Sequence, residues 1–115
     1  MEGTEAAYAT ASGMAAISST LLSICDAGDV IVSSHSVYGG TFALMKDFLP
    51  AKCGIRTVFV DLGDAAAVEA AVAEHKPKVL YAETLANPTL AVADLPTLSG
   101  IAKKYGATFV VDNTF

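Results

Sequence analysis

The chain has 115 residues, enough for one domain with a buried core, and a formal net charge of −5 from 12 acidic and 7 basic residues. Hydrophobic residues make up 53% of it and charged residues 17%, which is a globular rather than a disordered composition. The basic residues are scattered and Arg56 is the only arginine, so we expect no nucleic-acid partner. No apolar run reaches the length of a membrane span, so we expect no membrane partner either.

In chain order, short apolar runs alternate with helical patterns. The expected strands are residues 30–32, 57–60, 78–82 and 107–111, and the expected helices are residues 12–24, 41–49, 65–74 and 95–104. Ser12, Asp64 and Asp94 are expected N-caps, and Pro50 is expected to end the second helix. Continuous apolar strands joined by single helices predict an α/β fold with a mainly parallel sheet flanked by helices.

The two cysteines and the N-terminus indicate the compartment. Cys25 and Cys53 have neither metal-ligand spacing nor a CxxC pattern, which predicts no metal site and favours small buried thiols over a disulfide. The acidic start at residues 1–5 lacks the basic and apolar regions of a signal peptide. Together these features predict a cytoplasmic protein.

Both ends of the chain are abrupt. The sequence stops at Phe115, three residues beyond Asp112 and directly after an apolar strand, although the last strand of such a series normally leads to another element. We therefore expect residues 1–115 to be one partial domain, incomplete at both ends.

Polar residues follow three of the expected strands, at the edge where open α/β sheets bind ligands. Tyr38 lies in a glycine-rich turn after the first strand, and its ring either stacks on a flat ligand or covers the sheet edge. Asp112 follows the last strand, and its carboxylate either pairs with a protonated ring nitrogen or caps a following helix. We expect these side chains to converge.

Two further segments each admit two interpretations. Ser12, Gly13 and Met14 open the first helix, where free N–H groups form either a phosphate cradle or a plain serine cap. Asn87 lies in a turn after the third strand, as either a fixed polar ligand or an ordinary Asx-turn residue. Glu83 either positions that turn or is solvated.

Four stretches together resemble the Cys/Met-metabolism (trans-sulfuration) family of pyridoxal-phosphate (PLP) enzymes. They are residues 11–17, 38–41, 83–88 and 110–115, in family order and at family-like spacing. The resemblance implies part of the large PLP-binding domain of a fold-type I, aspartate-aminotransferase-like enzyme. It also implies that the backbone of Gly13 and Met14 holds the cofactor phosphate.

The same resemblance implies roles for four side chains. Tyr38 would stack on the pyridine ring and assist proton transfer, Asp112 would pair with the ring nitrogen, and Asn87 would reach the 3-oxygen. Thr114 would lie near the cofactor. The family's Schiff-base lysine lies beyond the aspartate, and none of the six lysines in this chain occupies the matching place.

The implied function is that of a longer parent enzyme. It would be a PLP-dependent lyase or transferase, catalysing γ-elimination or γ-replacement on methionine, cystathionine or an O-acyl homoserine, and assembling as a homotetramer. Residues 1–115 alone would bind PLP weakly and be inactive, because the covalent anchor is missing. The alternatives are a non-catalytic α/β ligand-binding domain and a Rossmann unit, although no GxGxxG motif supports the latter.

Overall fold

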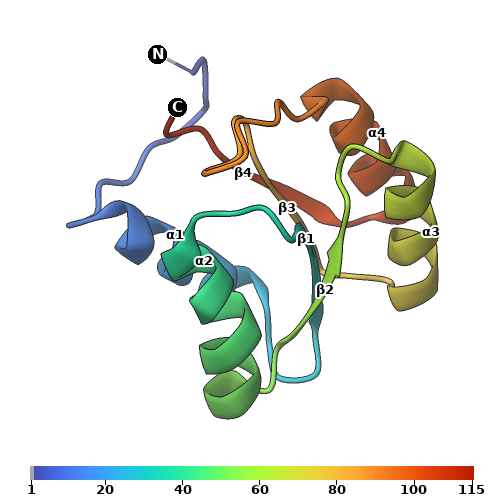
Figure 1. The fold of residues 1–115 in the computed structure, drawn as a ribbon. Helices are drawn as coiled ribbons and strands as arrows, with labels where there is room; N and C mark the ends of the chain where they lie inside the picture. The colour runs from blue at the N-terminus through green and yellow to red at the C-terminus, as the bar shows by residue number, and fades with distance from the viewer. Residues whose placement is uncertain (1) are drawn as a thin grey trace.

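A computed structural model describes residues 2–115 as helices packed on both faces of a four-stranded parallel sheet (Figure 1). The strands are β1 (Val30–Ser34), β2 (Arg56–Val60), β3 (Val79–Glu83) and β4 (Thr108–Asp112), in the order β2-β1-β3-β4. The helices are α1 (Gly13–Ile24), α2 (Gly39–Ala43), the π-helix η1 (Leu44–Cys53), α3 (Ala65–His75) and α4 (Leu95–Tyr105). All three strand pairs are parallel, so the predicted fold class is confirmed.

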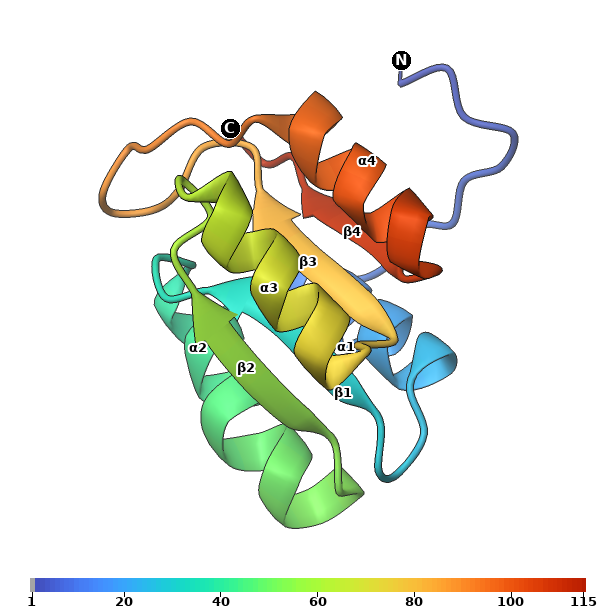
Figure 2. The same ribbon diagram turned by 90° about the vertical axis from the view of Figure 1, so that its right-hand side faces the viewer.

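The two faces of the sheet carry separate apolar clusters. Helices α3 and α4 cover one face, and α1, α2 and η1 cover the other (Figure 2). Successive strand residues alternate between the clusters: Ile31 packs with α1 and η1, whereas Val32 packs with α3 and α4. Tyr81 and Leu80 divide in the same way on β3.

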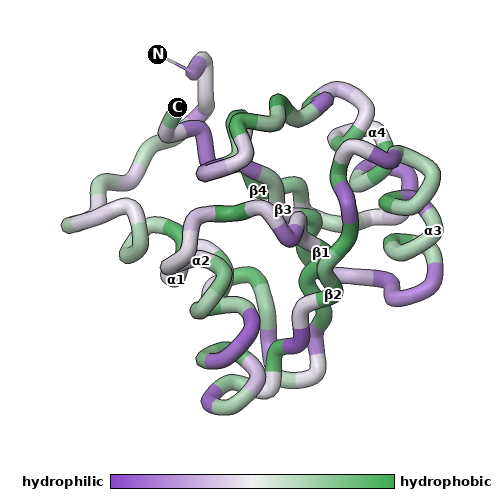
Figure 3. The backbone as a smooth tube through the Cα atoms, in the orientation of Figure 1, coloured by the Kyte–Doolittle hydropathy of each residue, from purple (hydrophilic) through white to green (hydrophobic). Residues whose placement is uncertain are grey.

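Burial separates the central strands from the edge strands. The first four residues of β1 and all five of β3 are buried, and both strands are largely hydrophobic (Figure 3). In β2 and β4, Arg56 and Thr108 are exposed and the other residues are half-buried. The prediction that the strands are buried on both faces is therefore confirmed for β1 and β3. It overstates burial for β2 and β4, which each have one neighbouring strand among residues 2–115.

The predicted helix end at Pro50 is wrong. The helical segment that begins at Gly39 continues through Pro50 as the π-helix η1 and ends at Cys53. A wider π turn relieves the clash that a proline ring makes with the carbonyl four residues earlier in an α-helix. Buried Met45 and Leu49 anchor the segment to the sheet, and Gly54, with φ of +66°, ends it.

The predicted N-caps are confirmed. Ser12 Oγ accepts the N–H of Ala15 at 3.1 Å, which begins α1 one residue after the cap. Asp64 begins α3 in the same way, and Asp94 begins α4. Each cap satisfies a backbone donor that the helix cannot.

Three further sequence expectations concern membrane spans, cysteines and metal sites. Among residues 2–115, no helix is long and apolar enough to cross a membrane. Cys25 is buried and Cys53 is half-buried, and both are free thiols. The same residues hold no group of three or more side chains suited to a metal ion.

Tyr81 is fully buried against α1, and its hydroxyl has no hydrogen-bond partner among residues 2–115. Burial, followed by the nearby carboxylates of Asp112 and Glu83, raises the pKa of Tyr81 well above its ordinary value. The unfolded phenol ionises near pH 10 and the folded one does not. Stability from this group is therefore complete below about pH 10 and is lost as the pH rises further.

We predict that Tyr81→Phe removes this alkaline loss. The free energy of unfolding of the wild type should fall more steeply above about pH 10 than that of the variant. At pH 7 the variant should be at least as stable as the wild type, because the hydroxyl that is removed is buried and has no hydrogen-bond partner among residues 2–115. Urea unfolding measured between neutral and alkaline pH tests this, and parallel pH profiles would contradict it.

Candidate functional site

The strand order creates a crevice at the carboxyl ends of β1 and β3. The chain leaves β1 toward α2 on one face of the sheet and leaves β3 toward α4 on the other (Figures 1 and 2). Connections that diverge in this way open the sheet edge to a ligand. A cavity of about 340 Å³ lies there, within the usual size of small-ligand sites.

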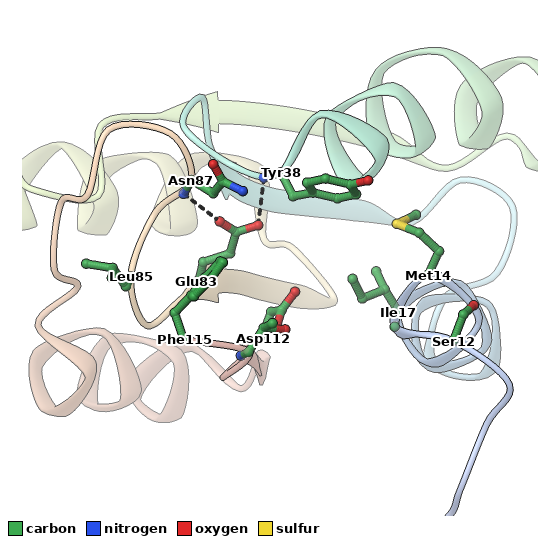
Figure 4. A pocket seen from close by; sticks show the side chains of 11 residues that line it. Ser12, Met14, Ile17, Tyr38, Glu83, Leu85, Asn87, Asp112 and Phe115 are labelled. Carbon is green, nitrogen blue, oxygen red and sulfur yellow. Dashed lines mark hydrogen bonds between the residues drawn. The ribbon is translucent and has the colours of Figure 1, made fainter.

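The cavity brings together every predicted site residue (Figure 4). Its lining consists of Ser12, Gly13, Met14, Ile17, Tyr38, Glu83, Leu85, Asn87, Asp112, Thr114 and Phe115. These residues come from four separate segments, so the expected convergence is present. Their roles toward a ligand remain predictions.

The N-terminus of α1 forms one end of the cavity. The Ser12 side chain takes up the N–H of Ala15, and the Ser12 carbonyl takes up that of Ala16. The N–H groups of Gly13 and Met14 have no acceptor among residues 2–115. Two free donors at the positive end of a helix dipole favour an anion.

Asp112 lies at the other end of the cavity, as the last residue of β4. Its Oδ1 atom accepts the N–H of Thr114 at 3.0 Å and also accepts the Thr114 hydroxyl. Its Oδ2 atom has no hydrogen-bond partner among residues 2–115. One carboxylate oxygen is therefore fixed locally and the other is available to a ligand. The bond to the Thr114 N–H is compatible with the alternative helix-cap role as well.

Tyr38 stands between these two ends, immediately before α2. Its side chain is 50% exposed, and its ring lies next to the sulfur of Met14 (Figure 4). Gly40 makes this placement possible, because a Cβ atom there would lie 2.8 Å from Tyr38 Cε1 and 3.2 Å from Met14 Sδ. The exposed ring is free to cover a flat ligand in the cavity.

Asn87 reaches the cavity from a short, tightly bonded loop. The loop is closed by hydrogen bonds from Ala86 N–H to the Ala91 carbonyl and from Ala93 N–H to the Thr84 carbonyl. The Asn87 side chain makes no hydrogen bond within residues 2–115, so the Asx-turn interpretation finds no support. Its amide remains free to bond a ligand.

Glu83 joins the Tyr38 and Asn87 segments. Its Oε1 atom accepts the N–H of Tyr38 at 2.7 Å, and its Oε2 atom accepts the N–H of Asn87 at 3.2 Å (Figure 4). The residue is 7% exposed, so it positions the turn and is not solvated. Its place at the end of a buried strand was the only sequence signal for this role.

Sequence reasoning missed the apolar walls of the cavity, Ile17, Leu85 and Phe115. Ile17 could have been predicted from the sequence, because it lies one helical turn after Gly13 and so on the same face of α1. His35, by contrast, does not line the cavity and stacks on Phe59 with ring centroids 5.6 Å apart.

The cavity carries opposite electrostatic character at its two ends. Free N–H groups lie at the α1 end, and the carboxylates of Glu83 and Asp112 lie at the strand ends. Among residues 2–115, no lysine, arginine or histidine lines it. The arrangement suits a ligand with an anionic group at one end and a cationic nitrogen at the other.

Comparison with known proteins agrees with this geometry. A model of the Cys/Met metabolism PLP-dependent enzyme family matches residues 1–115. The chain is 54% identical over all 115 residues to a methionine gamma-lyase of Arabidopsis thaliana and covers 26% of that protein. It is 45% identical to O-acetylhomoserine sulfhydrylase of Wolinella succinogenes, with a TM-score of 0.83 over 90% of this chain and 29% of that one.

A third relative shows the cofactor. The crystal structure of a putative O-acetylhomoserine (thiol)-lyase of Campylobacter jejuni contains N'-pyridoxyl-lysine-5'-monophosphate. It is 35% identical, with a TM-score of 0.83, and the match covers 90% of this chain and 25% of that one. The chain spans between a quarter and a third of the length of the relatives it matches.

The chain therefore belongs to the Cys/Met metabolism family of PLP-dependent enzymes, and PLP is the cofactor of that family. The residues present fit this group. An anionic phosphate matches the free N–H groups of Gly13 and Met14, and a protonated pyridine nitrogen matches the free oxygen of Asp112. None of the six lysines lines the cavity within residues 2–115.

We predict that Gly40→Ala displaces the Tyr38 ring without unfolding the chain. The added methyl group would meet the end of an exposed side chain, which moves at little cost. Gly39→Ala is the matched control, because a Cβ atom there meets nothing within 4 Å. Nuclear Overhauser contacts between the Met14 methyl group and the Tyr38 ring should be lost only in Gly40→Ala. Their survival in that variant would show that Gly40 does not set the ring position.

Proposed function

We propose that the whole protein carrying this chain is a PLP-dependent carbon–sulfur lyase or trans-sulfuration transferase. Its substrates would be small amino acids, and its reaction γ-elimination or γ-replacement on methionine, cystathionine or an O-acyl homoserine. The family match and the names of the similar proteins support this class. The observation that carries the proposal is the cavity with free helix N–H groups at one end and the free Asp112 oxygen at the other.

Bound PLP supplies an electron sink for a negative charge that develops on the substrate. Gly13 and Met14 hold its phosphate through their backbone N–H groups. Asp112 would pair with the ring nitrogen and favour its protonated form, and Thr114 fixes the Asp112 carboxylate by bonding one of its oxygens.

Tyr38 and Asn87 act on the remaining parts of the ring. The Tyr38 ring would cover one face of the cofactor and exclude water, and its Oη atom would assist proton transfer. The Asn87 amide would donate to the 3-oxygen and so help to orient the ring. Both assignments are what the resemblance to the family implies, and the position of both side chains in the cavity lining supports them.

The wider context of the enzyme is also a proposal. We propose a cytoplasmic homotetramer, the location and assembly that the sequence and its resemblance to the family imply. We further propose that residues 1–115 alone bind PLP weakly and catalyse no elimination. No lysine of the described chain lines the cavity to form the covalent link.

We predict that Asp112→Asn in the whole protein lowers PLP affinity by roughly 10- to 100-fold, the effect of losing a hydrogen bond between charged groups. Asparagine has nearly the same shape but no charge to hold the ring nitrogen protonated. Absorbance titration of the protein with PLP measures the affinity, and release of keto acid from methionine measures turnover. Both should fall.

Asp94→Asn is the control, because Asp94 caps α4 and does not line the cavity. It should keep wild-type PLP affinity and turnover. Equal PLP binding by Asp112→Asn and wild type would remove the basis of the proposed function.

A further inference from the structure

We propose that Glu83 is a positioning residue that sets the Tyr38 and Asn87 segments together, as one unit. The inference rests on the proposed function for what the two segments hold, but not for the bonds that join them. Among residues 2–115, the hydrogen bonds between residues 38–41 and the loop at 84–93 all run through this one carboxylate. The two segments otherwise belong to separate crossovers of the sheet.

The chemistry of a carboxylate suits this role better than that of any other side chain. An ionised glutamate has two acceptor oxygens and no donor, and each oxygen here takes one N–H group. A glutamine has one oxygen, which accepts, and one NH2 group, which only donates, so it can replace only one of the two carboxylate oxygens. An alanine satisfies neither.

The surroundings leave the two backbone amides as the hydrogen-bond partners of this carboxylate within residues 2–115. Glu83 is buried and lies directly beside Asp112 on the neighbouring strand, where two like charges repel. No lysine or arginine within residues 2–115 forms a salt bridge with it. The two hydrogen bonds from backbone N–H groups therefore offset the cost of burying the Glu83 carboxylate.

Coupling follows from sharing one side chain. Any motion of Glu83 changes the support of the ring-covering tyrosine and of the asparagine at the same time. Loss of this carboxylate therefore weakens the backbone support of both segments at once.

Hydrogen exchange of the backbone amides in the PLP-free whole protein tests the bonds directly. In the wild type, the N–H groups of Tyr38 and Asn87 should both be protected. In Glu83→Ala both should exchange at least roughly 10-fold faster, and in Glu83→Gln one of the two should keep its protection. The near-isosteric glutamine variant keeps the test decisive even when the alanine variant unfolds.

Asp64→Ala is the matched control, because it removes a carboxylate–amide bond at the N-terminus of α3, outside the cavity. It should leave exchange at Tyr38 and Asn87 unchanged. Unchanged exchange of both amides in the glutamine variant would overturn the proposal, as would equal acceleration in the Asp64→Ala control.

PLP titration separates this inference from the proposed function. Glu83→Gln should lower PLP affinity by roughly 10-fold, the loss of one hydrogen bond to a charged group. If the wild type binds no PLP but the Glu83 variants show the graded loss of amide protection, the proposed function is refuted and the positioning role of Glu83 is supported. If the wild type binds PLP, and Glu83→Gln has the same PLP affinity and the same amide exchange as the wild type, only the positioning role of Glu83 is refuted.

Discussion

The parallel pairing of β1 with β3 is the constraint on which the rest of the structure depends. Because the chain leaves these neighbouring strands toward opposite faces of the sheet, their carboxyl ends cannot be closed over by a single loop. The turn carrying Tyr38 and the loop carrying Asn87 therefore face each other across a gap. The N-terminus of α1 and the end of β4 complete the walls of that gap.

The cavity combines a helix N-terminus with a strand-end carboxylate, and neither feature alone indicates a particular ligand. Free N–H groups at a helix N-terminus are common, and a carboxylate at a strand end is costly unless it finds a partner. Because both line one cavity, they suit a molecule with an anionic group at one end and a cationic nitrogen at the other. This complementarity links the backbone of Gly13 to the side chain of Asp112, although almost the whole chain separates them in sequence.

The sequence predicted the fold and most of the site for identifiable physical reasons. Apolar runs and capping residues act locally, so Ser12, Asp64 and Asp94 began helices where expected. The prediction that the helix ends at Pro50 was wrong because burial of neighbouring η1 residues outweighed the helix-breaking tendency of proline. The partial exposure of β2 and β4 depends on strand order, which no local pattern contains.

Glu83 shows where sequence reasoning stops. A glutamate at the end of a strand is equally consistent with solvent and with burial, and its two amide partners come from opposite sides in sequence. Only the folded arrangement of β1, β3 and their loops decides between these. The apolar wall residue Phe115 is a similar case, since its contact with the cavity depends on the path of the chain beyond β4.

We propose that this cavity holds PLP with its phosphate at α1 and its ring nitrogen at Asp112. A crystal structure of the whole protein grown with PLP tests it most directly. The account predicts phosphate oxygens on the backbone N–H groups of Gly13 and Met14, and the ring nitrogen within hydrogen-bond distance of Asp112. A cofactor bound elsewhere, or bound here with its phosphate toward Asp112, would contradict the account.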